Sequence, residues 1–263
     1  MLNYRIIARA FAGLIGLEGL LFLVCWLVGL GYGETHHSTW YIPIGICAAL
    51  SVILGLLGGK GPTRFERRDG FFIVAMVWLI YCALGMLPFL FGGHLHRVSE
   101  AFFETMSGFT TTGSTAFTNI DALPHSILLW RSVTHWVGGM GIIFFTLALL
   151  PALGIGEQEL FTAEATGLKL GKLHSRVNTT AHYLWSTYLF VTIACAIAYR
   201  ICGMNTFDAI NHSFAAIATG GFSTHTANIA YFHSPAIEYV SVLFMFLGAT
   251  NFTLLYFVLF KRR

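Results

Sequence analysis

Charged residues are scarce in this chain. Only 10% of its 263 residues are Asp, Glu, Lys or Arg, whereas 56% are hydrophobic, and the mean hydropathy is +0.71. Soluble globular domains carry about 25% charged residues, so the composition excludes an ordinary water-soluble domain and predicts an all-α protein that crosses a membrane several times. The formal net charge of +3 is too small to indicate nucleic-acid binding.

Cysteine is also rare, and its spacing excludes two common roles. The five cysteines lie in apolar segments without a Cys-x-x-Cys pair: Cys25, Cys47, Cys82, Cys195 and Cys202. We expect small buried hydrophobic side chains rather than a disulfide framework or a metal site. No Ala-x-Ala cleavage site follows the first apolar run, which begins after Arg9 and is too long for a signal peptide. We therefore expect an uncleaved first membrane helix.

Long apolar runs fill most of the chain. A crossing needs about 20 such residues, and the sequence predicts crossings at 10–31, 40–58, 71–92, 126–153 and 183–202, with a last one from Pro235 to the C-terminal residues. Because basic residues favour the cytoplasmic side, we predict that both termini are cytoplasmic. Twelve of the fifteen Lys and Arg residues then lie inside: Arg5, Arg9, Lys60, Arg64, Arg67, Arg68, Lys169, Lys172, Arg176, Lys261, Arg262 and Arg263.

Two segments, 98–109 and 206–217, have a helical pattern but are too short to cross. Each runs into a stretch rich in Gly, Thr and Ser, at Ser107–Thr115 and Ala218–Thr224, which disfavours a helix. At membrane depth, irregular backbone is tolerated only when it is buried in protein or lines a watery cavity. We interpret both stretches as ion filters, in which main-chain carbonyls replace the hydration shell of a cation. Taken alone, Thr-Thr-Thr-Gly is equally compatible with a loop before a helix.

An internal repeat favours the filter interpretation. A shift of 108 residues superimposes Glu100 on Asp208, Thr111 on Thr219, and Gly113 on Gly221. Both copies start and return on the inner side, so they are parallel repeats. We predict four parts: a two-helix unit at 1–69, a first pore repeat at 70–155, a cytoplasmic linker at 156–181, and a second pore repeat at 182–263.

Three groups of polar residues outside the filters need an explanation. Glu104 and Arg131 are expected to pair behind the filter, because an unpaired charge there is expensive; direct contact with ions is the alternative. For Glu18, in the first helix, we favour a hydrogen bond between helices over a transport role. The spacings His36-His37 and His94-x-His96 permit metal binding, but we expect surface histidines.

The repeated order of helix, short helix, filter and helix resembles the Trk/Ktr/HKT superfamily of potassium uptake proteins, and within it the bacterial TrkH type. The residues that carry the likeness are Ser-Gly-Phe-Thr-Thr-Thr-Gly-Ser-Thr, Ala-Thr-Gly-Gly-Phe-Ser-Thr, and the helix segment at 129–141. That superfamily carries four repeats in one chain, and this sequence holds two. The gating loop of its third repeat and the intramembrane arginine of its fourth therefore have no counterpart here. The chain resembles an N-terminal half, which is compatible with a split gene product, a truncation, or a half that dimerises.

The resemblance implies a potassium transporter of the bacterial inner membrane, with K⁺ as the transported ion, no covalently bound cofactor and no catalytic residues. It places K⁺ on main-chain carbonyls of Thr111, Thr112, Thr219 and Gly220. The flanking filter residues are Thr110, Gly113, Ala218 and Gly221. The implied partners are the missing C-terminal half or a second copy, a homodimer, membrane lipid and a cytosolic TrkA-type nucleotide-binding regulator. Two alternatives are an inserted fragment that conducts nothing, and an intramembrane enzyme, for which we find no catalytic motif.

Overall fold

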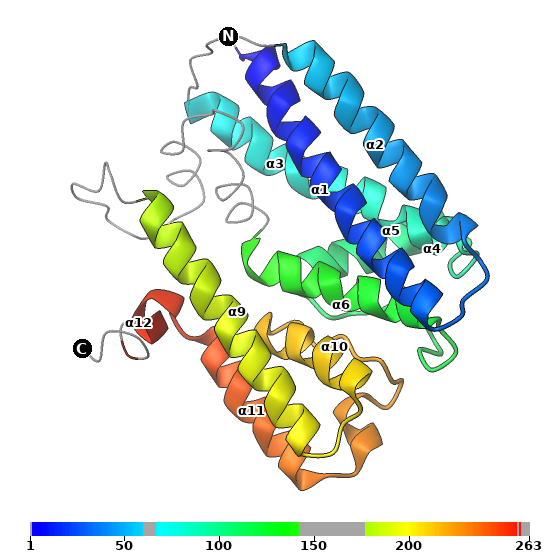
Figure 1. Cartoon of the computed structure of the whole chain (residues 1–263), viewed down its shortest axis with the longest axis vertical. Helices are drawn as coiled ribbons and strands as arrows, with labels where there is room; N and C mark the ends of the chain where they lie inside the picture. The colour runs from blue at the N-terminus through cyan, green and yellow to red at the C-terminus, as the bar shows by residue number, and fades with distance from the viewer. Residues whose placement is uncertain (1, 60–66, 142–176, 257, 259–263) are drawn as a thin grey trace.

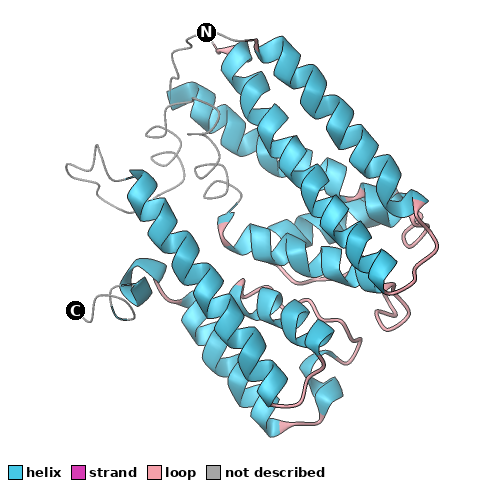
Figure 2. Cartoon of the chain, in the orientation of Figure 1, coloured by secondary structure: helices cyan, strands magenta, loops and turns pink. Residues whose placement is uncertain are grey.

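The chain is described by a computed structural model that covers residues 2–59, 67–141, 177–256 and 258. Within these ranges all regular elements are helices (Figure 2). Residues 156–176 of the predicted linker at 156–181 lie outside the described residues. The same holds for residues 142–153 of the crossing predicted at 126–153.

Two long helices form the N-terminal unit. α1 (Tyr4–Gly31) and α2 (Ser38–Gly58) lie side by side (Figure 1). Small residues permit their close approach, since a Cβ atom at Gly19 would lie 3.0 Å from Cβ of Cys47. The Ser51 hydroxyl also donates to the carbonyl of Ala12, at 2.7 Å. Both helices reach the ends predicted from the sequence, although α1 begins six residues earlier than expected.

The first repeat contains α3 (Arg67–Gly85), α4 (Leu87–Phe91), α5 (Val98–Phe109) and α6 (His125–Gly139). The crossing predicted at 71–92 is interrupted at Met86, between α3 and α4. Pro88 is the physical cause, because it has no N–H group and its ring displaces the carbonyl four residues earlier. The short helix α5 has the bounds predicted from the sequence.

The second repeat contains α9 (Val177–Ile201), α10 (Thr206–Ile217), the 3-10 helix η2 (Asn228–Phe232), α11 (Pro235–Ala249) and α12 (Phe252–Tyr256). α10 begins and ends 108 residues after α5, as the repeat requires. The side chain of Asn205 caps α10 by accepting the amide of Asp208 at 2.8 Å. The single final crossing predicted from Pro235 is instead broken at Thr250 and Asn251.

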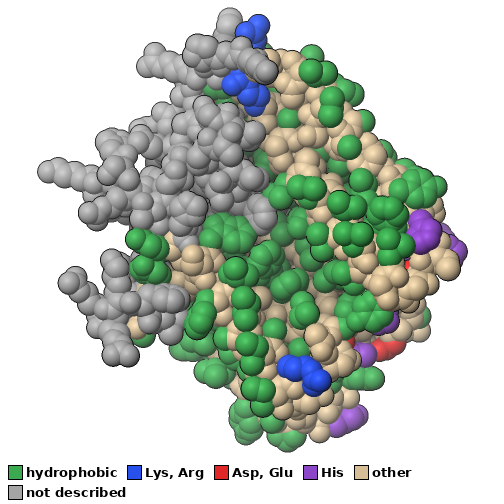
Figure 3. Space-filling view, in the orientation of Figure 1, with side chains coloured by type: hydrophobic (Ala, Val, Ile, Leu, Met, Phe, Trp, Pro, Cys, Tyr) green, Lys and Arg blue, Asp and Glu red, His purple; other side chains and the backbone are tan. Residues whose placement is uncertain are grey.

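Four helical spans in the described residues are long and apolar enough to cross a bilayer: Tyr4–Gly31, Ser38–Gly58, Arg68–Phe91 and Tyr183–Ile201. Hydrophobic side chains cover much of the visible face of the molecule (Figure 3). In a soluble protein such a surface would cost free energy, whereas in a bilayer it contacts lipid tails. The chain is therefore a multi-pass membrane protein.

Helix α6 joins the two halves of the molecule. It contacts α1 and α5 on one side and α10 on the other (Figure 1). One hydrophobic cluster lies among the N-terminal unit and the first repeat, and a second lies in the second repeat together with Met140 at the end of α6. Trp136 of α6 packs against both clusters. The position of α6 therefore fixes how the two repeats face each other.

Candidate ion filter

Both short helices end in the same way. The amide of Thr112 donates to the Ser107 carbonyl at 2.9 Å, and that of Thr111 donates to Gly108 at 3.0 Å. This is the Schellman pattern, which satisfies the last carbonyls of a helix and turns the chain sharply away. In the second repeat the amides of Gly220 and Thr219 make the equivalent bonds, to Ala215 and Ala216, at 2.9 and 3.1 Å. Each filter stretch thus starts from a defined helix end.

The turn residue of each Schellman motif is a threonine with a left-handed backbone. Thr111 and Thr219 both have φ of 53°. Glycine normally fills this position, and a β-branched residue there is strained by roughly 1–3 kcal/mol. Two residues later, Gly113 and Gly221 have φ of 79° and 95°, as expected for glycines in these filters. The sequence gives no signal for the two left-handed threonines, because threonine rarely adopts this conformation.

The two filter stretches touch each other. A Cβ atom at Gly113 would lie 1.9 Å from the carbonyl oxygen of Gly220, so only glycine permits this approach. The helices that follow the filters also use glycine at equivalent places. A Cβ atom at Gly138 would lie 2.1 Å from the Phe109 carbonyl oxygen, and one at Gly248 would lie 2.5 Å from that of Ile217. Each return helix is therefore pressed against the last turn of its own short helix.

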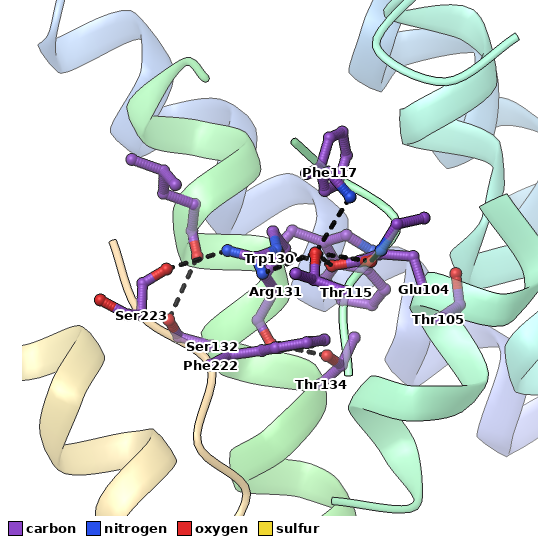
Figure 4. Close-up of polar contacts among 12 residues, drawn as sticks. Glu104, Thr105, Thr115, Phe117, Trp130, Arg131, Ser132, Thr134, Phe222 and Ser223 are labelled. Carbon is purple, nitrogen blue, oxygen red and sulfur yellow. Dashed lines mark hydrogen bonds and ion pairs between the residues drawn. The ribbon is translucent and has the colours of Figure 1, made fainter. Parts of the chain in front are cut away.

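A buried ion pair lies behind the first filter (Figure 4). Nε of Arg131 is 2.8 Å from Oε1 of Glu104, and both side chains are at most 1% exposed. Glu104 also accepts the hydroxyl of Thr115, at 2.9 and 3.0 Å to its two oxygens, and the amide of Ala116 at 2.7 Å. Arg131 donates onward to the carbonyl of Ser223, at 2.9 Å. One charge pair thus holds the exits of both filters.

The second repeat replaces this carboxylate with a histidine. His212 stands 108 residues after Glu104, and its Nε2 lies 3.4 Å from Oγ of Ser223 and 3.3 Å from Oγ1 of Thr224. Thr224 also donates to Oδ1 of Asp208, at 2.7 Å. The equivalent positions of the two short helices therefore both contact the exit of their own filter, one through a carboxylate and the other through an imidazole. The sequence predictions assign no role to His212, although its position, equivalent to that of Glu104 in the repeat, is the signal that identifies it.

The loops that follow the two filters are bridged by a histidine between two carboxylates. Nδ1 of His225 is 2.9 Å from Oδ1 of Asp121, and its Nε2 is 3.1 Å from Oδ2 of Asp208. Hydrogen bonds from Thr226 and, second, from His225 lower the pKa of the half-exposed Asp121 to about 2. The exit of the first filter is thereby tied to the exit of the second.

Glu18 does not make the expected hydrogen bond. Its side chain is fully buried, and neither carboxyl oxygen has a hydrogen-bond partner among the described residues. Instead, the carboxyl packs close to Gly85, where an added Cβ atom would lie 3.2 Å from Oε1. The described part of the chain also contains no group of three His, Cys, Asp or Glu residues that would hold a metal ion.

Comparison with known proteins decides the family. The TrkH family, described as cation transport protein, matches residues 36–263. The chain belongs to this family. The Trk system potassium uptake protein TrkH of Escherichia coli K12 is 40% identical over 256 residues, which cover 94% of this chain and 52% of that protein. The TrkG protein of the same strain is 35% identical and covers 99% of this chain and 54% of its own length.

A solved structure has the same fold. The crystal structure of the potassium transporter TrkH from Vibrio parahaemolyticus superposes with a TM-score of 0.83 at 38% identity. The match covers 99% of this chain and 53% of that one. The chain thus spans about half the length of the TrkH family proteins that it matches, and it corresponds to their N-terminal half.

Proposed function

We propose that this chain supplies two of the filter segments of a potassium-selective pore and takes part in potassium uptake. K⁺ would bind main-chain carbonyls of Thr111, Thr112, Thr219 and Gly220, flanked by Thr110, Gly113, Ala218 and Gly221. The observation that carries the proposal is the matched backbone of the two filters. Left-handed residues recur at the same two positions in both repeats, and the stretches meet at Gly113 and Gly220. Oxygen dipoles held at fixed positions are what a dehydrated cation requires.

Open space beside the second filter supports the idea that a complete ring of filter segments needs segments that this chain does not supply. Gly113 is closed off by the next filter, whereas an added Cβ atom at Gly221 would have no neighbour within 4 Å in the described part of the chain. A cavity of about 240 Å³ lies beside it, lined in part by Ser241 and Met245 of α11. We infer that a further filter segment occupies this side. It would come from a C-terminal half or from a second copy.

The location and partners follow from the same proposal. We place the chain in the bacterial inner membrane with both termini in the cytoplasm, because that orientation puts most basic residues inside. The predicted parts at 1–69, 70–155, 156–181 and 182–263 then become a peripheral two-helix unit, two pore repeats and their cytoplasmic linker. A homodimer and a cytosolic TrkA-type regulator complete the proposed system. An inserted fragment that conducts nothing is the alternative when no other filters are present.

Growth rescue tests the proposal. A bacterium that lacks potassium uptake would express this chain alone, or together with the C-terminal half of E. coli TrkH, which shares the family. We expect growth at low potassium only when the two halves are present together, since two filters make half a ring. Rescue by the chain alone would instead support a pore built from two copies. Absence of rescue in both cases, with the protein present in the membrane, would contradict the proposed function.

A further inference from the structure

The two filters differ in how much of the chain supports them. No residue from Thr110 to Thr115 in the first filter is buried. In the second filter Ala218, Gly220, Phe222 and Ser223 are buried, and the intervening Thr219 and Gly221 are exposed. Both filters begin from the same helix end, so the short helices do not account for the difference. A neighbour that packs along the second filter more closely than along the first must account for it.

That neighbour is α6, the return helix of the first repeat. Arg131, His135 and Gly139 are spaced four residues apart and therefore share one face of the helix. Gly139 lies against Ala218, where an added Cβ atom would be 2.6 Å from Cβ of Ala218. At the other end, Arg131 donates to the carbonyl of Ser223 at 2.9 Å. The second filter thus runs along this face of α6 from Ala218 to Ser223.

Phe222 is the main contact in the middle of this face. Its ring stacks on His135, with centroids 4.0 Å apart and an interplanar angle of 13°. Its amide donates to Nδ1 of His135 at 3.4 Å, and the guanidinium of Arg131 lies 4.3 Å from its ring centroid (Figure 4 labels Arg131 and Phe222). The backbone is equally restricted, because an added Cβ atom at Gly220 would lie 2.3 Å from Nδ1 of His135.

The internal repeat shows that this arrangement belongs to the second filter. The position equivalent to Phe222 in the first filter is Ser114, which is exposed. On α11 the positions equivalent to Arg131 and His135, aligned on Gly138 and Gly248, are Ser241 and Met245. The described residues therefore contain one such contact face, and it connects the first repeat to the filter of the second.

We propose that α6 is the template that fixes the backbone of the second filter, with His135 and Phe222 as positioning residues that set its ion selectivity. The helix acts across the repeat boundary, so the first repeat determines the geometry of carbonyls that the second repeat supplies. The effect on selectivity rests on the proposed function, whereas the effect on the backbone does not. Ring stacking and the hydrogen bond from the Phe222 amide both favour the observed backbone of the second filter.

Hydrogen–deuterium exchange tests the effect on the backbone. In the purified chain we expect His135→Ala and Phe222→Leu each to speed amide exchange in residues 218–224, while residues 110–115 exchange as before. His135→Asn keeps an acceptor and should restore part of the protection. Phe11→Leu removes a similar volume from a buried site in α1 and serves as the control. Unchanged exchange in residues 218–224 would overturn the template proposal, whether or not the protein transports potassium.

Selectivity is measured with the C-terminal half supplied, as sodium competition against rubidium uptake. We expect His135→Ala and Phe222→Leu to lower discrimination about tenfold, which corresponds to roughly 1.4 kcal/mol, and Phe11→Leu to leave it unchanged. If the unsubstituted protein discriminates and these variants do so equally well, the positioning role is wrong and the proposed function stands. If the unsubstituted protein transports nothing, the proposed function fails, and the exchange experiment still decides whether α6 is the template.

Discussion

At the scale of single residues, the two filters depend on backbone conformations that side chains normally disfavour. Thr111 and Thr219 occupy left-handed positions at a strain of roughly 1–3 kcal/mol each. Such strain persists only when the surroundings hold the conformation in place, and here the Schellman bonds of the preceding helix provide that restraint. The glycines two residues later relieve the chain at no steric cost. Substitution of a filter glycine, compared with substitution of a glycine of similar φ elsewhere, distinguishes backbone strain from an effect on the filter.

Gly113→Ser is expected to weaken discrimination of K⁺ over Na⁺ more than it lowers insertion into the membrane. The new side chain would meet the carbonyl oxygen of Gly220 and distort both filters together. Gly33→Ser is a matched control, because Gly33 has a similar φ of 75° against 79° but an added Cβ atom there meets no atom within 4 Å in the described chain. Sodium competition against rubidium uptake measures the effect. Equal selectivity in the two variants would count against the filter assignment.

Asp121 should make stability depend on pH. Its pKa in the folded chain is about 2, below the value near 3.9 of an unfolded aspartate. The hydrogen bonds from Thr226 and His225 to the Asp121 carboxylate therefore stabilise the fold fully above about pH 4. This contribution disappears as the pH falls through about 2. We expect Asp121→Asn to lower the thermal midpoint slightly at pH 6, because the carboxylate is 48% exposed and well screened.

The difference between Asp121→Asn and the unsubstituted chain should shrink as the pH approaches 2. Thermal unfolding in detergent from pH 7 to pH 2 measures it. Glu238→Gln, at an exposed carboxylate of α11, is the control. A difference that stays constant over the whole range would show that the carboxylate charge of Asp121 does not stabilise the fold.

At the scale of elements, the buried Glu104–Arg131 ion pair connects three segments that are far apart in the sequence. Glu104 comes from α5, Arg131 from α6, and the carbonyl of Ser223 from the second filter (Figure 4). A buried pair of this kind contributes little to net stability, because both charges lose their hydration. Removal of one partner is far more costly, since the other charge remains buried and uncompensated. We therefore interpret the pair as a contact that fixes the positions of α5, α6 and the second filter relative to one another.

A double-mutant cycle tests this interpretation. Glu104→Gln and Arg131→Gln should each destabilise the chain by about 3–5 kcal/mol, and the double variant should lose less than the sum, by roughly 1–3 kcal/mol. Thermal or denaturant unfolding in detergent gives the values. Additive effects would contradict the pairing as the source of stability. Arg97 and Glu100, an exposed pair at 3.5 Å, provide a control cycle with little coupling expected.

At the scale of the whole molecule, the features fixed by local pattern were predictable, and those fixed by packing were not. The bounds of α5 and α10 follow from their flanking residues and from the repeat, which also predicts the left-handed glycines. The break at Met86 has a local cause in Pro88, yet the apolar run conceals it. The contact of α6 with the second filter has no local signal: the charge of Arg131 predicts a partner such as Glu104, but nothing in the sequence connects Arg131 or His135 to residues 218–224.

The exposure of the first filter has a consequence for the order of biogenesis. The second filter has its proposed template, α6, within the chain, whereas no residue from Thr110 to Thr115 is buried. During synthesis α6 is made before the second filter, so its proposed template is already present when residues 218–224 are added, whereas the first filter is made before α6. The second filter can therefore take its final conformation against a helix that is already in place.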